Sequence, residues 1–442
     1  MGNLRDEDSG SMLLSIWRST RSGPLRSQNV SRLAAVQTCE GSRQMMSPET
    51  WYNFAWILSG ALYTAAWSPA GMLIWMVLWL TERASLRRLR RSVEFGIRDS
   101  GETPNLFFAL PSDRPLVRLW QFLLLAMMIA AVGAVDRASA IGTTVGFALS
   151  SYFGLSAAPY FHRREERIRT YVVTPIALTV VLISVLLVVL RLSGTFRVTL
   201  FGLNENLMGT LLLLGVGVSM AYSEILSRCG RFGLVAFQVI VGLGIYSTGS
   251  RGALIGLGVL ILARAFYNVK HLVAAAGVLA LVSGLILSGV IPMRLEPDPG
   301  RVRLWNTAWE LIHANPWFGI GANNFFAVTE ELARSDSSVA TSTHAHNLLL
   351  QVALDTGLVG TVIFVALLGL VIWRCFRLLR HGADSVSRGL VATLVSVLVR
   401  EMVDVHLFYV MALDVYVWLL IGLIAERHYA SVKEKRRSVT PS

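Results

Sequence analysis

The sequence predicts an all-α, polytopic integral membrane bundle of about eleven or twelve transmembrane helices, with one large, partly helical loop on the outer side. Three observations carry this prediction. Hydrophobic residues make up 54% of the chain and charged residues 15%, more apolar surface than a soluble core of this size needs. The apolar residues form runs near the length of a membrane span, and basic residues cluster beside the ends of those runs.

The runs are expected to be helices, because unpaired backbone amides are very costly in hydrocarbon. The clear runs lie at 117–135, 140–160, 171–190, 206–222, 232–248, 252–268, 272–292, 347–372, 389–406 and 408–425. Residues 52–80 hold either one kinked span or two short ones, because Ser68-Pro69-Ala70-Gly71 interrupts the stretch.

The basic clusters set the orientation. They lie at 83–91, 163–169, 228–231, 374–380 and 433–437, and alternation of the spans allows all of them to be cytoplasmic. The net charge of +12 follows from these clusters, so no nucleic-acid partner is expected. A cytoplasmic start then favours two spans within residues 52–80.

This orientation divides the chain into parts. Residues 1–50 are expected to be a flexible cytoplasmic tail, 51–425 a transmembrane domain and 426–442 a basic cytoplasmic tail. Residues 293–346, called here the long segment, form a polar insertion on the outer side. The outer side also receives the stretch 191–206, the turn 249–252 and the corner near Asp404 and His406.

The long segment is predicted to be ordered. Trp305, Trp309 and Ile312 follow spacings of four and three, which indicates an amphipathic helix over 302–314 on the membrane surface or over a cavity. Asn315-Pro316 ends that helix, and Gly319 and Gly321 permit a tight turn.

The long segment closes with two histidines, His344 and His346, directly before the next span. An imidazole with its ordinary pKa of about 6.5 is neutral at about pH 7 and can take a proton from a hydroxyl, which suits a general base. The alternative is a histidine that only hydrogen-bonds the start of the helix. A metal site is not expected, because the long segment offers no convincing third ligand.

Four arginines of the outer side are candidates for substrate binding. Arg251 lies in a short glycine-flanked turn between two apolar runs, where a lone guanidinium normally faces a polar cavity or a partner. Arg191 ends a run, and Arg301 and Arg303 lie just before the expected amphipathic helix. Guanidinium groups match phosphate oxygens, so several on one side favour an anionic substrate; the alternative is that they reach headgroups or water.

A charged cluster interrupts the penultimate run. Arg400 and Asp404 are four residues apart, on one face of the expected helix, where they can pair. Glu401 and His406 lie beside them. A structural ion pair inside the bundle is the favoured interpretation.

Together these residues resemble the O-antigen ligase and polymerase superfamily. The matching stretches, in the family's order, are Arg191 to Phe196, Ser250 to Ala253, Arg303 to Gly321, His344 to Gln351 and Thr356 to Gly360. They cover the chain from about Arg191 to Gly360, whereas the first part of the chain carries nothing distinctive.

The resemblance implies a metal-independent, inverting glycosyltransferase without a cofactor, in the bacterial inner membrane with its active site facing the periplasm. Such enzymes transfer a glycan from undecaprenyl diphosphate to a hydroxyl of a lipid or glycan acceptor. By motif, His346 matches the catalytic histidine, and Arg251 and Arg191 match arginines that bind the donor diphosphate. His344 is a further candidate for substrate binding.

Two assignments stay open within the resemblance. Arg303 fits the family's loop arginine better than Arg301. Many relatives carry Asn-Pro-Asn soon after the Gly-Thr-Phe stretch, whereas here a longer interval leads to Asn204-Glu205-Asn206, so Arg197 rivals Arg191.

Three functions follow from the sequence. The first is a ligase that transfers a polysaccharide to a lipid A core or comparable acceptor. The second is a polymerase of the same superfamily that extends O-antigen or exopolysaccharide repeats, which the loop motifs do not separate from a ligase. The third is a secondary transporter, disfavoured because the sequence shows no convincing internal repeat.

Overall fold

The computed structural model describes residues 110–162, 165–194, 204–223, 230–266, 268–288, 299–335, 342–380 and 383–439. All described residues belong to one compact unit, Trp56–Ser442. The expected tail 1–50, the spans within 52–80 and Arg197 lie outside the described residues.

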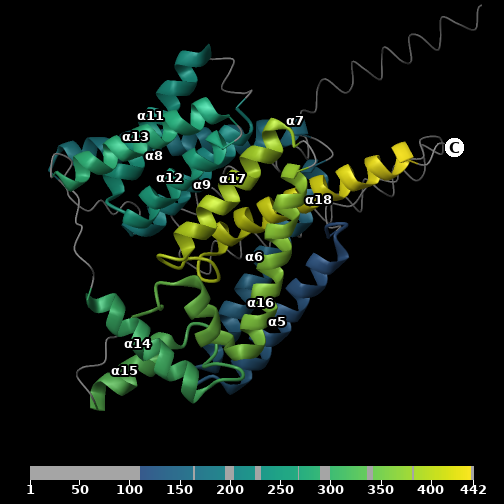
Figure 1. The fold of residues 1–442 in the computed structure, drawn as a ribbon. Helices are drawn as coiled ribbons and strands as arrows, with labels where there is room; N and C mark the ends of the chain where they lie inside the picture. The colour runs from purple at the N-terminus through teal and green to yellow at the C-terminus, as the bar shows by residue number, and fades with distance from the viewer. Residues whose placement is uncertain are drawn as a thin grey trace, which may run out of the picture. The chain divides into compact units, whose positions relative to one another are not determined.

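Every described element is a helix, and none of the ranges just given contains a strand. The helices are α5 (Arg114–Gly133), α6 (Arg137–His162), α7 (Glu165–Ile168), the π-helix η1 (Arg169–Val173), α8 (Thr174–Leu192), α9 (Glu205–Ala221), α11 (Gly230–Thr248), α12 (Arg251–Ala265), α13 (Val269–Leu287), α14 (Pro299–Ala314), α15 (Phe325–Ser335), α16 (Leu348–Arg380), α17 (Ser385–Glu401) and α18 (Met411–Val439) (Figure 1). Each of the ten clear apolar runs overlaps one of these helices, which confirms the all-α class for the described residues.

Two of the described helices, α5 and α16, are long and apolar enough to cross a membrane by length and composition. Shorter apolar helices cover Ile176–Leu192, Glu205–Ala221, Phe232–Thr248 and Leu272–Leu281. The structure thus supplies two candidate spans in the part of the chain that it describes.

Small residues let the helices approach closely. α18 packs along α6, and α17 packs against both α9 and α12 (Figure 1). A Cβ on Gly154 of α6 would lie 2.4 Å from Val415 O of α18, and one on Gly389 of α17 would lie 2.5 Å from Ala221 Cα. Glycines at these crossings are typical of tightly packed apolar helices.

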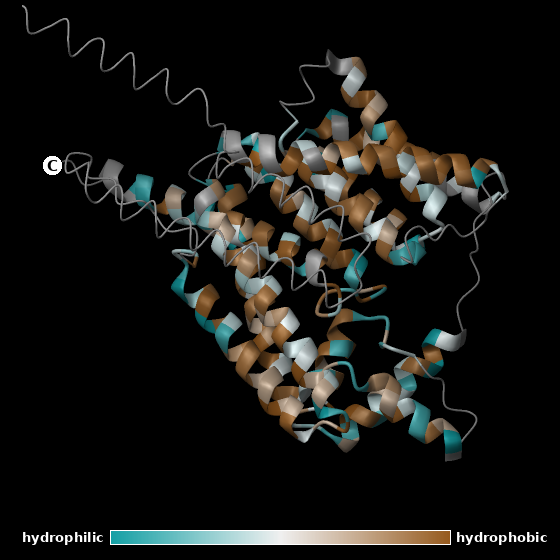
Figure 2. Ribbon diagram, turned by 180° about the vertical axis from the view of Figure 1, so that it is seen from behind, coloured by the Kyte–Doolittle hydropathy of each residue, from teal (hydrophilic) through white to brown (hydrophobic). Residues whose placement is uncertain are grey.

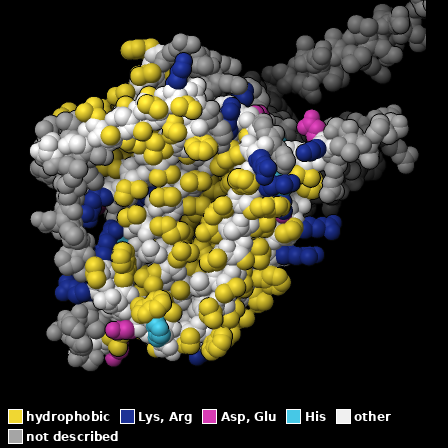
Figure 3. All heavy atoms as spheres, in the orientation of Figure 1, with side chains coloured by type: hydrophobic (Ala, Val, Ile, Leu, Met, Phe, Trp, Pro, Cys, Tyr) yellow, Lys and Arg dark blue, Asp and Glu magenta, His cyan; other side chains and the backbone are white. Residues whose placement is uncertain are grey.

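Apolar side chains also cover much of the outside of these helices. Figure 2 shows hydrophobic residues along their length, and in Figure 3 they form a broad continuous face. The exposed residues include Phe122, Leu125, Ile129 and Val132 of α5, Leu178, Leu182 and Val189 of α8, and Leu358, Val362, Val365, Ile372 and Phe376 of α16. An apolar face of this extent is typical of a surface covered by lipid or by another protein.

The long segment contains two helices. α14 confirms the predicted amphipathic helix, and the turn after it has positive φ angles at Gly319 and Gly321, as predicted. α15 was not predicted. A hydrophobic cluster beneath α14 and α15 includes Ala308, Phe325 and Ala345.

Three boundaries differ from the predictions. α17 ends at Glu401, so Asp404 and His406 lie in a non-helical corner, residues 402–410, rather than inside a span. α18 continues to Val439, so most of the predicted basic tail 426–442 is helical. α16 extends to Arg380 and breaks at Gly357, whose φ is 61° and ψ −163°.

Candidate active site

Two histidines and an aspartate meet where the long segment joins α16. His346 Nδ1 lies 2.6 Å from Asp404 Oδ1, and His344 Nε2 lies 3.4 Å from the same oxygen. The two imidazole rings are 4.2 Å apart. Asp404 is buried, whereas both histidines are half-buried. A neutral imidazole that donates its Nδ1–H to a carboxylate keeps Nε2 free to accept a proton.

The backbone of His346 is held in a conformation that L-residues rarely adopt. Its φ is 53°, which costs free energy for any residue other than glycine. Neighbouring contacts maintain it. The preceding residue, Ala345, donates its N–H to Gln351 Oε1 at 2.6 Å and accepts from Trp305 Nε1 at 2.9 Å. Asn347 donates to Met402 O at 2.9 Å. The histidine is therefore fixed from both sides.

Asp404 is fixed by Arg400, which is fully buried at the end of α17. Arg400 Nη1 donates to Asp404 O at 2.6 Å, and Nη2 lies 3.5 Å from Asp404 Oδ2. Burial alone raises the pKa of Asp404, but the hydrogen bonds from His344 and His346 and the nearby Arg400 charge outweigh burial and hold this pKa below its usual range. Asp404 is therefore an ionised partner for the histidines.

The predicted Arg400–Asp404 pair exists, but its basis differs from the prediction. Asp404 lies beyond the helix end, and its carboxylate also faces His346. The carboxylate of Glu401 lies 2.8 Å from Arg400 Nη1 and offsets its charge. It also accepts hydrogen bonds from the N–H groups of His406 and Leu407, at 2.7 and 3.0 Å. The sequence missed Asp404 as a site residue, although it lies on the same predicted side as the histidines.

Arg400 also connects this site to the turn that carries Arg251. Its Nη2 donates to Asn206 O at 3.0 Å, and Asn206 Oδ1 accepts from Ser250 Oγ at 2.8 Å. Ser250 caps the first turn of α12 by accepting from Ala253 N at 3.3 Å, and Arg251 is the first residue of that helix.

The remaining arginines take different positions. The Arg191 guanidinium lies 5.7 Å from the Tyr246 ring, near the end of α11 that leads to Arg251. Arg301 Nη1 donates to Val403 O at 2.7 Å, directly before Asp404. The side chain of Arg303, which the sequence favours over Arg301, is exposed on α14.

A second buried network supports the histidines from α16. Gln351 Nε2 donates to Asp355 Oδ1 at 2.9 Å, and Tyr409 of the corner donates to Asp355 Oδ2 at 2.5 Å. Because Gln351 also accepts from Ala345, this network joins the corner to the histidine-bearing backbone. The His344 ring lies 6.4 Å from the Tyr409 ring.

His344, His346 and Asp404 also have the spacing of metal ligands. Each offers a ligand atom, and these atoms lie within 4.8 Å of one another. The long segment itself supplies only the two histidines, and Asp404 of the corner is the candidate third ligand, which the sequence did not predict. Hydrogen bonds to the shared carboxylate account for the same spacing without an ion.

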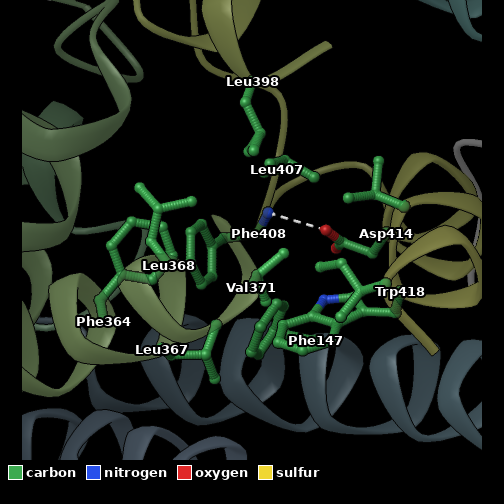
Figure 4. Close-up of a pocket in the computed structure, with 12 residues that line it drawn as sticks. Phe147, Phe364, Leu367, Leu368, Val371, Leu398, Leu407, Phe408, Asp414 and Trp418 are labelled. Atoms are coloured by element: carbon green, nitrogen blue, oxygen red, sulfur yellow. Dashed lines mark hydrogen bonds between the residues drawn. The ribbon is translucent and has the colours of Figure 1, made fainter. Parts of the chain in front are cut away.

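An apolar cavity of about 30 Å³ lies behind the corner (Figure 4). Phe147, Phe364, Phe408 and Trp418 line it, and the carboxylate of Asp414 accepts from Phe408 N at 3.1 Å. Its volume allows no more than a few water molecules.

One part of the chain matches a known protein family. Residues 235–365 match the family model described as O-Antigen ligase, and this range contains Arg251, Arg301, Arg303 and both histidines. Asp404, Arg400 and Arg191 lie outside it. No curated protein matches the chain. Over residues 235–365 the chain is therefore similar to the O-antigen ligase family, in agreement with the resemblance that its motifs predicted.

Proposed function

We propose that this protein is a membrane-embedded glycosyltransferase that moves a glycan from undecaprenyl diphosphate to a hydroxyl of a lipid A core or similar acceptor. Members of its superfamily are glycosyltransferase-like enzymes of the inner membrane. The observation that carries the proposal is the 2.6 Å contact between His346 and Asp404, because it gives the motif histidine the partner that a general base needs.

In this mechanism His346 is the general base. Donation of its Nδ1–H to Asp404 leaves the lone pair of Nε2 for the proton of the acceptor hydroxyl, and the carboxylate stabilises the imidazolium that forms. The Ser342 hydroxyl lies 3.5 Å from Nε2 and marks a position that an acceptor hydroxyl can take.

The acceptor oxygen then forms a bond to the anomeric carbon of the donor sugar as the bond from that carbon to the phosphate oxygen breaks. The proton passes to His346 Nε2, and the bonding electrons leave with the diphosphate. A single displacement of this kind inverts the anomeric carbon. The diphosphate is already a competent leaving group, so the proposed step requires no metal ion.

The arginines offset the charge on the leaving diphosphate. Arg191 of α8 and Arg251 of α12 stand on helices that both pack against α9 and α11. Asn206 and Ser250 connect the start of α12 to the site. We assign Arg191 and Arg251 to donor binding. Arg301 and Arg303 of α14 provide two further positive charges, and His344 contacts substrate beside the base.

The proposal places the helical bundle across the bacterial inner membrane with the His346 end in the periplasm. The opposite end is rich in basic groups, which is typical of a cytoplasmic face. Arg374 Nη2 there donates to Asp113 Oδ1 at 3.0 Å, and Arg427 Nη1 lies 2.9 Å from Asp384 Oδ2. The exposed apolar residues between the two ends would contact lipid.

The test compares His346→Ala with His313→Ala in a strain that lacks the chromosomal gene. His313 is an exposed histidine of α14 that contacts Trp309 O within its own helix at 2.8 Å, so it is a matched control. We expect His313→Ala to restore the surface glycan and His346→Ala to fail at equal protein level. Normal glycan in the His346→Ala strain would refute the proposal.

The glycan that remains in the gene-deleted strain distinguishes a ligase from a polymerase. Loss of a ligase leaves uncapped core while lipid-linked polymer accumulates. Loss of a polymerase leaves core capped with single repeats, or no secreted polymer. Electrophoresis of lipopolysaccharide, together with extraction of the lipid-linked pool, distinguishes these outcomes.

A further inference from the structure

The turn that joins α14 to α15 is bonded to the break in α16. Leu358 N donates to Pro316 O at 2.7 Å, and Val359 N donates to Trp317 O at 3.2 Å. In the other direction, Ile320 N donates to Leu354 O at 2.9 Å. A Cβ on Gly357 would lie 2.4 Å from Trp317 C, so only glycine allows this approach. The backbone groups released by the break are thus satisfied by the long segment.

The break divides α16 into two parts with different surroundings. From Leu348 to Gly357 most side chains are buried or half-buried by the rest of the protein. From Leu358 onward an exposed apolar stripe begins, with Leu358 at 53% and Phe376, near its far end, at 57% exposure. The second part, 358–380, is about 34 Å long, close to the thickness of a bilayer's hydrocarbon core.

The C-terminal end of α5, the other candidate span, lies beside the same turn. A Cβ on Gly321 would lie 2.5 Å from Ala134 Cβ, directly after α5. Asp136 N donates to Asn324 Oδ1 at 2.7 Å. The turn therefore lies beside both the C-terminal end of α5 and the start of the second part of α16.

Two aromatic side chains project from this turn, with Trp317 63% and Phe318 44% exposed. Exposed aromatic residues are concentrated at membrane–water interfaces, where their rings sit at the level of the headgroups. The turn is bonded to Leu358, the first exposed residue of the α16 stripe. The two rings are therefore adjacent to the proposed lipid-facing surface.

We infer that Trp317 and Phe318 insert into the outer leaflet of the bilayer and anchor the long segment at the membrane surface. This inference rests on the membrane placement in the proposed function. The anchor fixes the depth of the segment that ends in His346, since the turn is bonded to α16 and the histidines directly precede that helix. A donor whose diphosphate lies at the headgroup level would meet the base there.

The test uses single cysteines labelled with an environment-sensitive fluorophore in a background of Cys39→Ser, Cys229→Ser and Cys375→Ala. The labelled variants are Trp317→Cys, Phe318→Cys, Val365→Cys and Glu330→Cys, reconstituted in phosphatidylethanolamine and phosphatidylglycerol vesicles. Val365 belongs to the exposed stripe of α16, and Glu330 is an exposed charged residue of α15. Nitroxide lipids, with the nitroxide near the headgroup or near the chain end, and aqueous iodide serve as quenchers.

We expect the label at position 365 to be quenched by the deep nitroxide and the label at 330 by iodide. Labels at 317 and 318 should be quenched best by the shallow nitroxide and several-fold less by iodide than the label at 330. If 317 and 318 behave like 330 while 365 is quenched in the bilayer, the anchor is refuted and the span survives. If 365 is quenched by iodide alone, the membrane placement fails and the anchor fails with it.

Discussion

His346 Nδ1 lies 2.6 Å from Asp404 Oδ1, which joins the end of the long segment to the corner between α17 and α18. The contact is tertiary, because the two residues lie in different segments of the chain. His346 is held by Trp305 and Gln351 through Ala345, and Asp404 is held by Arg400. The chemistry that we propose depends on this contact, because the carboxylate both orients the imidazole and stabilises its protonated form.

Asp404→Asn tests that dependence. The amide keeps the size of the side chain but loses the charge that stabilises the imidazolium, so we expect the transfer rate to fall on the order of 100-fold. Arg400 keeps Glu401 as its partner in this variant, and the rate is compared at equal amounts of folded protein. The measurement is glycan transfer by purified protein from a lipid-linked donor, and a rate equal to wild type would show that Asp404 has no part in proton transfer.

Removal of divalent cations tests whether His344, His346 and Asp404 bind a metal ion instead. Because hydrogen bonds account for the spacing of His344, His346 and Asp404, we expect transfer to proceed at an unchanged rate after dialysis against EDTA. Metal content of the purified protein is measured in parallel. A loss of activity that zinc or magnesium restores would instead identify the cluster as a metal site.

Most helices could be predicted from the sequence because an apolar run of span length has no other stable form in lipid. α14 was predictable from the spacing of Trp305, Trp309 and Ile312. The break in α16 was not, because Gly357 alone does not break a helix. It does so here because backbone groups of residues 316–320 replace the lost hydrogen bonds, and that pairing is tertiary.

The candidate site likewise contains some residues that the sequence could predict and others that it could not. His346 and Arg251 could be selected because their residue types and predicted side agree with the family motifs that the sequence resembles. Asp404 could not, because a pair with Arg400 in one helix already explained both charges. Only the end of α17 at Glu401 turns the Asp404 carboxylate toward the long segment. The contact of Arg301 with Val403 likewise depends on the corner rather than on α14.

Arg400→Met tests the buried charge network. The substitution leaves Glu401 and Asp404 buried without their cation, so we expect a loss of about 3–5 kcal/mol in stability. Arg334→Met is the matched control, because Arg334 forms exposed pairs with Glu330 and Glu331 that contribute less than about 1 kcal/mol. Thermal unfolding in detergent, followed by the monodisperse fraction on gel filtration, measures both. Equal unfolding midpoints would contradict the role of the network.

Gly357→Ala tests whether the break in α16 supports the site. The φ of 61° with ψ of −163° is accessible essentially to glycine alone, and a Cβ there would meet the backbone of Trp317 at 2.4 Å. We expect a loss of at least about 1–3 kcal/mol in stability. Transfer activity should also fall, because a displaced turn moves the start of α16 and with it His346. Gly369→Ala in the same helix is the control, since a Cβ there meets nothing within 4 Å. Helix propensity alone favours alanine over glycine at both positions, so a Gly357→Ala protein as stable and active as Gly369→Ala would mean that the break does not position the base.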